Sequence, residues 1–129
     1  MAYTTIDKST DYFNTVLYTG TGSSQAITGV GHAPNFVWIK CRDVAKDNMM
    51  FDSVRGVQKS IRSNSDNAQD TGSDFLSSFD SDGFTAGGNG KTNGSGSTYV
   101  SWNWKAGGTA STNTDGSITS SVSANTTAG

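Results

Sequence analysis

Residues 97–105 read Ser97-Thr98-Tyr99-Val100-Ser101-Trp102-Asn103-Trp104-Lys105, and this stretch decides the fold. Aromatic and β-branched residues favour strands, and successive side chains of a strand point to opposite faces. Val100, Trp102 and Trp104 therefore share one face, while Tyr99 lies on the other. The alternation predicts a strand with one buried face. Because tryptophan is highly buried on average, we expect the tryptophan face to lie in the core.

Outward from this stretch, further segments combine apolar or β-branched residues with flanking turn residues, which is the pattern of short strands. They are residues 12–19, 24–28, 35–42, 49–56, 57–63, 75–79 and 84–86. The segment that follows Pro34 is apolar on both faces until Lys40, which favours a central strand. Turn signals recur at the roughly 8–12-residue spacing of sandwiches and barrels. We therefore predict an all-β domain over residues 1–108, built as an antiparallel β-sandwich.

The composition disfavours helices before any pattern is considered. All 11 acidic residues are aspartate, which favours caps and turns, and the chain has no glutamate. The 16 glycines weaken helix interiors further. Five of them fall within residues 87–97, which predicts a flexible loop.

Residues 109–129 differ in character from the rest of the chain. They contain only two large apolar residues, Ile118 and Val122, and no aromatic residue. Such a stretch buries too little surface to offset its ordering entropy. We predict a linker or an extended C-terminal arm that becomes ordered only against a partner.

Charge and cysteine content exclude several classes of function. The net charge is −2 and the nine basic residues are scattered, so we expect no nucleic-acid binding. Cys41 is the single cysteine, which rules out an intrachain disulfide and a multi-cysteine metal site. No apolar run approaches the roughly 20 residues of a membrane helix, and the start lacks the features of a signal peptide. We expect synthesis in a host cytoplasm without membrane insertion.

The sequence nominates no catalytic set, metal site or cofactor site. His32, the only histidine, stands in a loop without a partner suggested by spacing. Asp80-Ser81-Asp82-Gly83 resembles the start of a calcium loop but lacks its later ligands, so a structural turn is the better interpretation. We predict that the chain is not an enzyme and binds no cofactor. Turnover that depended on His32 or on one aspartate would contradict this.

Aromatic residues of the 97–105 stretch offer one candidate binding surface. Trp102 and Trp104 are neighbours on one strand face and could form a platform on which sugars stack. Tyr99 is the third aromatic residue of the stretch. We name Trp102, Trp104 and Tyr99 as candidate glycan-contacting or partner-contacting residues, with burial in the core as the alternative.

Five segments occur in an order that resembles a known family. They are Tyr18-Thr19-Gly20-Thr21-Gly22, Phe36-Val37-Trp38-Ile39-Lys40, Asp52-Ser53-Val54-Arg55-Gly56, Phe79-Asp80-Ser81-Asp82-Gly83-Phe84-Thr85, and the run from Tyr99 to Gly108. The ordered set, over roughly residues 1–128, resembles an uncharacterised β-sandwich domain of tail-fibre and other virion proteins of marine tailed phages, especially cyanophages. The resemblance implies a concanavalin-like, lectin-like jelly roll and a place on the virion. It supplies no catalytic residues.

Three functions follow as expectations. The first is a structural virion protein, specifically the particle-attached N-terminal part of a tail fibre involved in host adsorption, for which the resemblance suggests a homotrimer. The second is a capsid decoration or knob protein, which copy number would distinguish. The third is a carbohydrate-binding module that recognises a host surface glycan. The expected partners are other virion proteins of the tail or capsid and further copies of the chain.

Overall fold

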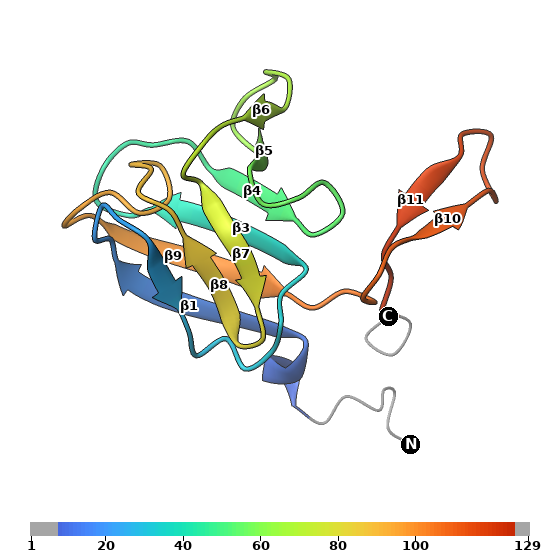
Figure 1. Ribbon diagram of the computed structural model, residues 1–129, viewed down its shortest axis with the longest axis horizontal. Coiled ribbons are helices and arrows are strands. Elements are labelled where there is room, and N and C mark those ends of the chain that lie inside the picture. The colour runs from blue at the N-terminus through green and yellow to red at the C-terminus, as the bar shows by residue number, and fades with distance from the viewer. Residues whose placement is uncertain (1–7, 126–129) are drawn as a thin grey trace.

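A computed structural model describes residues 8–125, which form strands, turns and loops, one short 3-10 helix and, in that range, no α-helix (Figure 1). The elements are η1 (Ser9–Asp11), β1 (Phe13–Thr19), β2 (Gln25–Ile27), β3 (Phe36–Cys41), β4 (Met49–Asp52), β5 (Lys59–Arg62), β6 (Asp70–Thr71), β7 (Leu76–Asp80), β8 (Gly83–Ala86), β9 (Thr98–Trp104), β10 (Ser111–Asn113) and β11 (Ser120–Val122). The predicted all-β class is confirmed.

Two antiparallel sheets form the main body in two layers. The larger sheet has the strand order β1-β9-β3-β4-β5-β6, and the smaller one has the order β2-β8-β7. In Figure 1 the smaller sheet lies in front of the larger one. Strand β9, which covers most of residues 97–105, lies between β1 and β3 and pairs antiparallel with both. The arrangement is therefore sandwich-like, and β9 is central to it.

The core lies between the two sheets and draws side chains from both. Its buried members are Ile27, Val37, Ile39, Cys41, Met49, Phe51, Phe75, Leu76, Phe84, Ala86 and Tyr99. The ring of Tyr99 stacks on that of Tyr18 at 5.2 Å, and Phe51 lies 5.9 Å from Phe75. Removal of this apolar surface from water, at roughly 25 cal/mol per Å², is the main stabilising contribution.

The buried and outward faces of β9 are the reverse of those predicted from the sequence. Tyr99, Ser101 and Asn103 are fully buried and face the smaller sheet, whereas Trp102 and Trp104 are only half-buried. The inward amide of Asn103 donates to the Asn14 carbonyl at 3.1 Å and to the Ser101 hydroxyl at 3.1 Å. Hydrogen bonding makes these small polar side chains tolerable inside the protein. The expectation that the tryptophan face lies in the core is wrong.

The loop over residues 87–97 is anchored rather than free. Thr92 and Asn93 in this loop are completely buried. The Asn93 amide donates to the Gly87 and Ser23 carbonyls, and the Tyr99 hydroxyl bridges Gly90 and Gly94. The predicted flexible loop is therefore wrong for this segment, because buried side-chain hydrogen bonds fix a glycine-rich backbone from within.

The chain after β9 forms a small hairpin instead of a featureless linker. Strands β10 and β11 make a separate two-stranded sheet that stands apart from the main body (Figure 1). Its base is tight, because a Cβ on Gly107 would lie 1.4 Å from the Ala124 carbonyl oxygen. Side chains along β11 are exposed, and Ile118 between the strands is 80% exposed. Residues 1–7 and 126–129, the ends of the predicted domain and arm, lie outside the described residues.

Candidate functional site: an aromatic sheet face

Apolar side chains gather on the outer face of the larger sheet, the face turned away from the smaller sheet. We call this surface the aromatic face. Its members come from β1, β9, β3 and β4, and they are Phe13, Leu17, Phe36, Trp38, Met50, Trp102 and Trp104, with the buried Val100 on the same face. Strand alternation places them together, since they occupy every second position of their strands.

Strand register aligns these residues into rows that cross the sheet. One row runs Phe13, Trp104, Phe36, and the next runs Thr15, Trp102, Trp38, Met50. Within the rows the ring centroids lie 4.9 Å apart for Phe13 and Trp104, 5.2 Å for Phe36 and Trp104, and 5.6 Å for Trp38 and Trp102. Tilted and edge-on contacts at these distances are favourable for aromatic pairs. The rings therefore support one another in a fixed array.

The aromatic face is accessible in the isolated chain. Phe13 is 36% exposed and Leu17 is 60% exposed, and the phenylalanine and tryptophan rings further in are half-buried by their neighbours. Trp38, Trp102 and Trp104 together line a hollow of about 250 Å³. All three tryptophans of the chain thus lie on one surface.

The structure separates the three residues that the sequence nominated for contact with a glycan or partner. Trp102 and Trp104 lie on the aromatic face, whereas Tyr99 is buried on the opposite side of the sheet. Burial raises the pKa of Tyr99 above its ordinary value, as expected for a phenol surrounded by protein. Tyr99 is therefore not part of the candidate site.

Sequence reasoning did not assign Trp38 and Phe36 to this surface. Both lie on β3, and they meet Trp102 and Trp104 through the β3–β9 register. The available signal was the alternation Phe36, Trp38, Lys40, in which a charged residue continues an aromatic series and marks a face that reaches solvent.

His32 and Asp82 have structural roles. The His32 ring is 5% exposed, and its Nδ1 lies 3.0 Å from the Thr10 carbonyl oxygen. The Asp82 carboxylate accepts hydrogen bonds from the backbone N–H groups of Gly31 and Gly29, and these bonds hold the pKa of the carboxyl below its usual range. Asp82 thereby holds the 28–34 loop against the turn between β7 and β8. This agrees with the interpretation of residues 80–83 as a structural turn.

Basic residues near the strands have several kinds of partner. Arg55 pairs with Asp52 across the turn after β4. The Lys105 ammonium lies 5.7 Å from the ring centroid of Tyr12, and Lys40 donates to the Lys46 carbonyl at 2.6 Å. In residues 8–125 no group of three or more histidine, cysteine or acidic side chains is placed to hold a metal ion.

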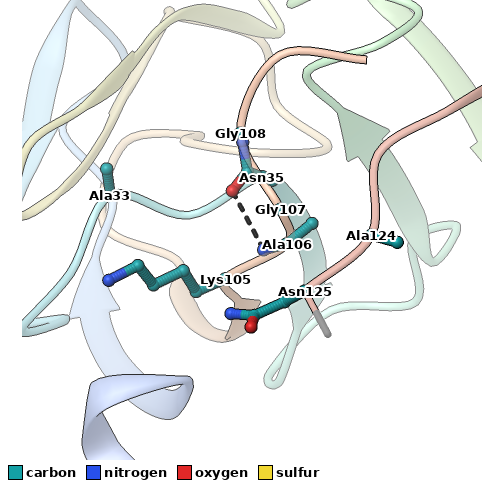
Figure 2. Close-up of a pocket in the computed structure, with 8 residues that line it drawn as sticks. All are labelled: Ala33, Asn35, Lys105, Ala106, Gly107, Gly108, Ala124 and Asn125. Carbon is teal, nitrogen blue, oxygen red and sulfur yellow. Dashed lines mark hydrogen bonds between the residues drawn. The ribbon is translucent and has the colours of Figure 1, made fainter. Parts of the chain in front are cut away.

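A second hollow lies where the hairpin leaves the main body (Figure 2). Its volume is about 550 Å³, and its lining is mostly backbone and small side chains from Ala33, Asn35, residues 105–108, Ala124 and Asn125. The Asn35 side-chain oxygen accepts from the Ala106 N–H at 2.9 Å and so ties β3 to the start of the arm. Lys105 is the one charged side chain in the lining. We therefore regard this hollow as part of the connection between the main body and the hairpin, and not as a candidate reactive site.

No helix within the described part of the chain is long and apolar enough to cross a membrane. Neither the curated proteins nor the solved structures include a match to this chain. A family model does match: it is described as a domain of unknown function (DUF7483), and it aligns with residues 8–129. That alignment spans nearly the whole sequence, and the chain belongs to the DUF7483 family.

Proposed function

We propose that this protein is a structural module of a tailed-phage virion, the particle-attached N-terminal part of a tail fibre, and that it docks through the aromatic face. The observation that carries the proposal is that Phe13 and Leu17 are exposed, and the three tryptophans are only half-buried, in a single chain. Soluble monomers rarely expose large contiguous apolar patches, and such patches mark interaction surfaces. The assignment to a phage virion is supported by the five ordered sequence motifs, which resemble those of virion proteins.

Assembly with a partner would bury the aromatic face, which the isolated chain leaves partly exposed. The core of a protein interface is apolar, and aromatic residues are enriched there. The fixed ring array around Trp38, Trp102 and Trp104 fits that description. The occupant we favour is a neighbouring copy or an adjacent tail protein, with a homotrimer suggested by the resemblance.

The proposal extends to the finer fold and to the arm. We assign the two facing sheets to a concanavalin-like jelly roll, as the resemblance implies. The β10–β11 hairpin has only three residue pairs, and isolated hairpins are marginally stable at best. We expect this arm to pack against a partner in the assembled fibre, which brings exposed Ile118 into contact.

Particle imaging tests the location. Phage particles labelled with an antibody against this chain should show density at the tail in a few copies. Capsid-wide labelling would favour the decoration-protein alternative, and absence of the chain from the virion would refute both.

Solution assembly tests the surface. Light scattering should show that Trp102→Ser reduces self-association or tail-protein binding, whereas Val54→Ser, at a 44% exposed valine in the turn after β4, should not. Equal behaviour of the two variants would remove the aromatic face from the proposal.

Carbohydrate binding is a second candidate, favoured by the hollow that Trp38, Trp102 and Trp104 line. Indole rings offer apolar faces on which the apolar faces of sugars can stack. Binding on a glycan array that Trp102→Ala abolishes, with the fold intact by circular dichroism, would support this function. No binding to any glycan would contradict it.

A further inference from the structure

Three lysines converge on a pocket of about 420 Å³ at one end of the aromatic face. Lys40 comes from β3, Lys46 from the β3–β4 loop, and Lys91 from the anchored 87–97 loop. We call this the lysine pocket. The Lys40 ammonium donates to the Lys46 carbonyl at 2.6 Å, and the Lys46 ammonium reaches toward Gly90. Segments distant in sequence therefore hold the three cations in one place.

The charges around the lysine pocket do not cancel. The Asp47 carboxylate lies 3.0 Å from Lys91, and Asp70 lies 2.6 Å from Arg62. A hydrogen bond from Lys91 holds the pKa of Asp47 below its ordinary value, so this carboxyl is ionised at neutral pH. Lys40 and Lys46 form no ion pair with any residue between 8 and 125. Two positive charges remain without an acidic partner.

The lysine pocket and the tryptophan hollow are neighbours along β3, which supplies Lys40 to the first and Trp38 to the second. Trp38 and Lys40 are two residues apart and occupy the same outer face. Two residues of a strand span about 7 Å, so the backbones of Trp38 and Lys40 are separated by about that distance. An aromatic stacking surface and an uncompensated cationic pocket therefore lie side by side on one face of the sheet, where a single ligand can contact both.

We propose that the lysine pocket receives the acidic group of a saccharide whose ring stacks on Trp38 and Trp102. Lys40 and Lys46 would supply charge-assisted hydrogen bonds to a carboxylate or sulfate. The expected ligand class is an acidic glycan, such as a polymer of uronic acids or a sulfated polysaccharide. This inference rests on the carbohydrate-binding function proposed above, and it adds the charge of the ligand.

Tryptophan fluorescence offers a direct test, because all three tryptophans line the hollow. The full chain is titrated with a hexamer of β-linked glucuronic acid and with the matching hexamer of β-linked glucose. The two ligands differ only in the carboxylate. We expect the acidic hexamer to bind about 2- to 30-fold more tightly, since two exposed lysines each form a modest ion pair with it. A sulfated glucose hexamer then shows whether sulfate replaces carboxylate.

Charge variants of the lysine pocket should either lower or raise the preference for the acidic hexamer. Lys40→Gln with Lys46→Gln should abolish the preference for the acidic hexamer, so that the acidic and neutral hexamers bind with equal affinity. Asp47→Asn, which removes a nearby negative charge, should increase the preference. The matched control is Lys8→Gln with Lys59→Gln, which makes the same change of net charge outside the pocket. Thermal midpoints check that each variant is folded.

Distinct outcomes separate failure of this inference from failure of carbohydrate binding. Equal binding of the two hexamers overturns the lysine pocket assignment and leaves the sugar platform standing. Loss of preference in the control as well as in the pocket variant overturns it too, because net charge alone then explains the effect. Binding of neither the neutral nor the acidic hexamers overturns both proposals.

Discussion

The two faces of β9 both carry aromatic residues, but their surroundings are opposite. Its inner face presents Tyr99 to the smaller sheet, followed by two small hydrogen-bonded residues, Ser101 and Asn103. Its outer face presents Trp102 and Trp104, which contact other rings of the same sheet and no second layer of described residues. Stability resides on the first face, and the candidate function resides on the second. The difference teaches that the largest rings of a small β-protein need not belong to its core.

The largest effect should come from a cavity on the inner side of the sheet. Phe51→Ala removes a fully buried ring that packs against Phe75, and we expect a loss of about 3–5 kcal/mol in the free energy of unfolding. Urea denaturation measures it. A loss below that of Trp102→Ala would mean that the inner and outer faces have been assigned the wrong way round.

Alkaline pH should act chiefly through two tyrosines of the inner face. Burial raises the pKa of both Tyr18 and Tyr99 in the folded chain. The stability that these groups contribute is fully present below the unfolded value of about 10 and is lost as pH rises above it. Each tyrosine should contribute a slope of up to about 1.4 kcal/mol per pH unit. Urea midpoints measured between neutral pH and pH ~11 check this, and a flat profile would argue against burial of these phenols.

A smaller effect should follow removal of one hydroxyl. The Tyr99 hydroxyl donates to the Gly90 carbonyl at 2.8 Å and accepts from the Gly94 N–H at 2.8 Å. Tyr99→Phe leaves these groups of the anchored loop without that partner, at a cost of about 1–3 kcal/mol. Hydrogen exchange at residues 87–97 should rise in parallel. Tyr12→Phe, near the start of β1, is the control and should change stability by less than about 0.5 kcal/mol.

Still smaller is the expected cost of truncation on the outer face. Trp102→Ala removes a half-buried ring whose main ring partner is Trp38, so stability should fall by only about 1–2 kcal/mol. Self-association or ligand binding should be lost even though the fold is retained. Unfolding of this variant at room temperature would contradict the separation of stability from function.

The smallest effect is spectroscopic and needs no substitution. Because all three tryptophans lie on the aromatic face, their emission reports that surface alone. In the dilute monomer, acrylamide should quench the emission readily. Assembly at higher concentration should shift the emission to shorter wavelength and reduce the quenching. Emission protected at every concentration would show that the face is covered already within one chain.

The sequence predicted the positions of the strands more reliably than it predicted which face of each strand is buried. The segments around β1, β3 and β9 follow from runs of β-branched and aromatic residues, and the turn at Asp80–Gly83 follows from its aspartates and glycine. The predicted strand over residues 49–56 ends at Asp52, because Asp52 caps the following turn by accepting from the Val54 and Arg55 N–H groups. The hairpin in residues 109–125 was missed because its serines and threonines carry no apolar alternation.

By itself, the sequence determined that the chain forms antiparallel strands and that Trp102 and Trp104 share a face with Val100, since alternation is a local property of extended backbone. Only the tertiary structure decided which face is covered. That choice depends on where β2, β7 and β8 come to lie, which the alternation within β9 does not encode. It also depends on the contacts of Tyr18, Tyr99 and the 87–97 loop, which form once the layers meet. Trp102 and Trp104, which the sequence predicted to be core residues, therefore lie on the outer surface because of long-range packing.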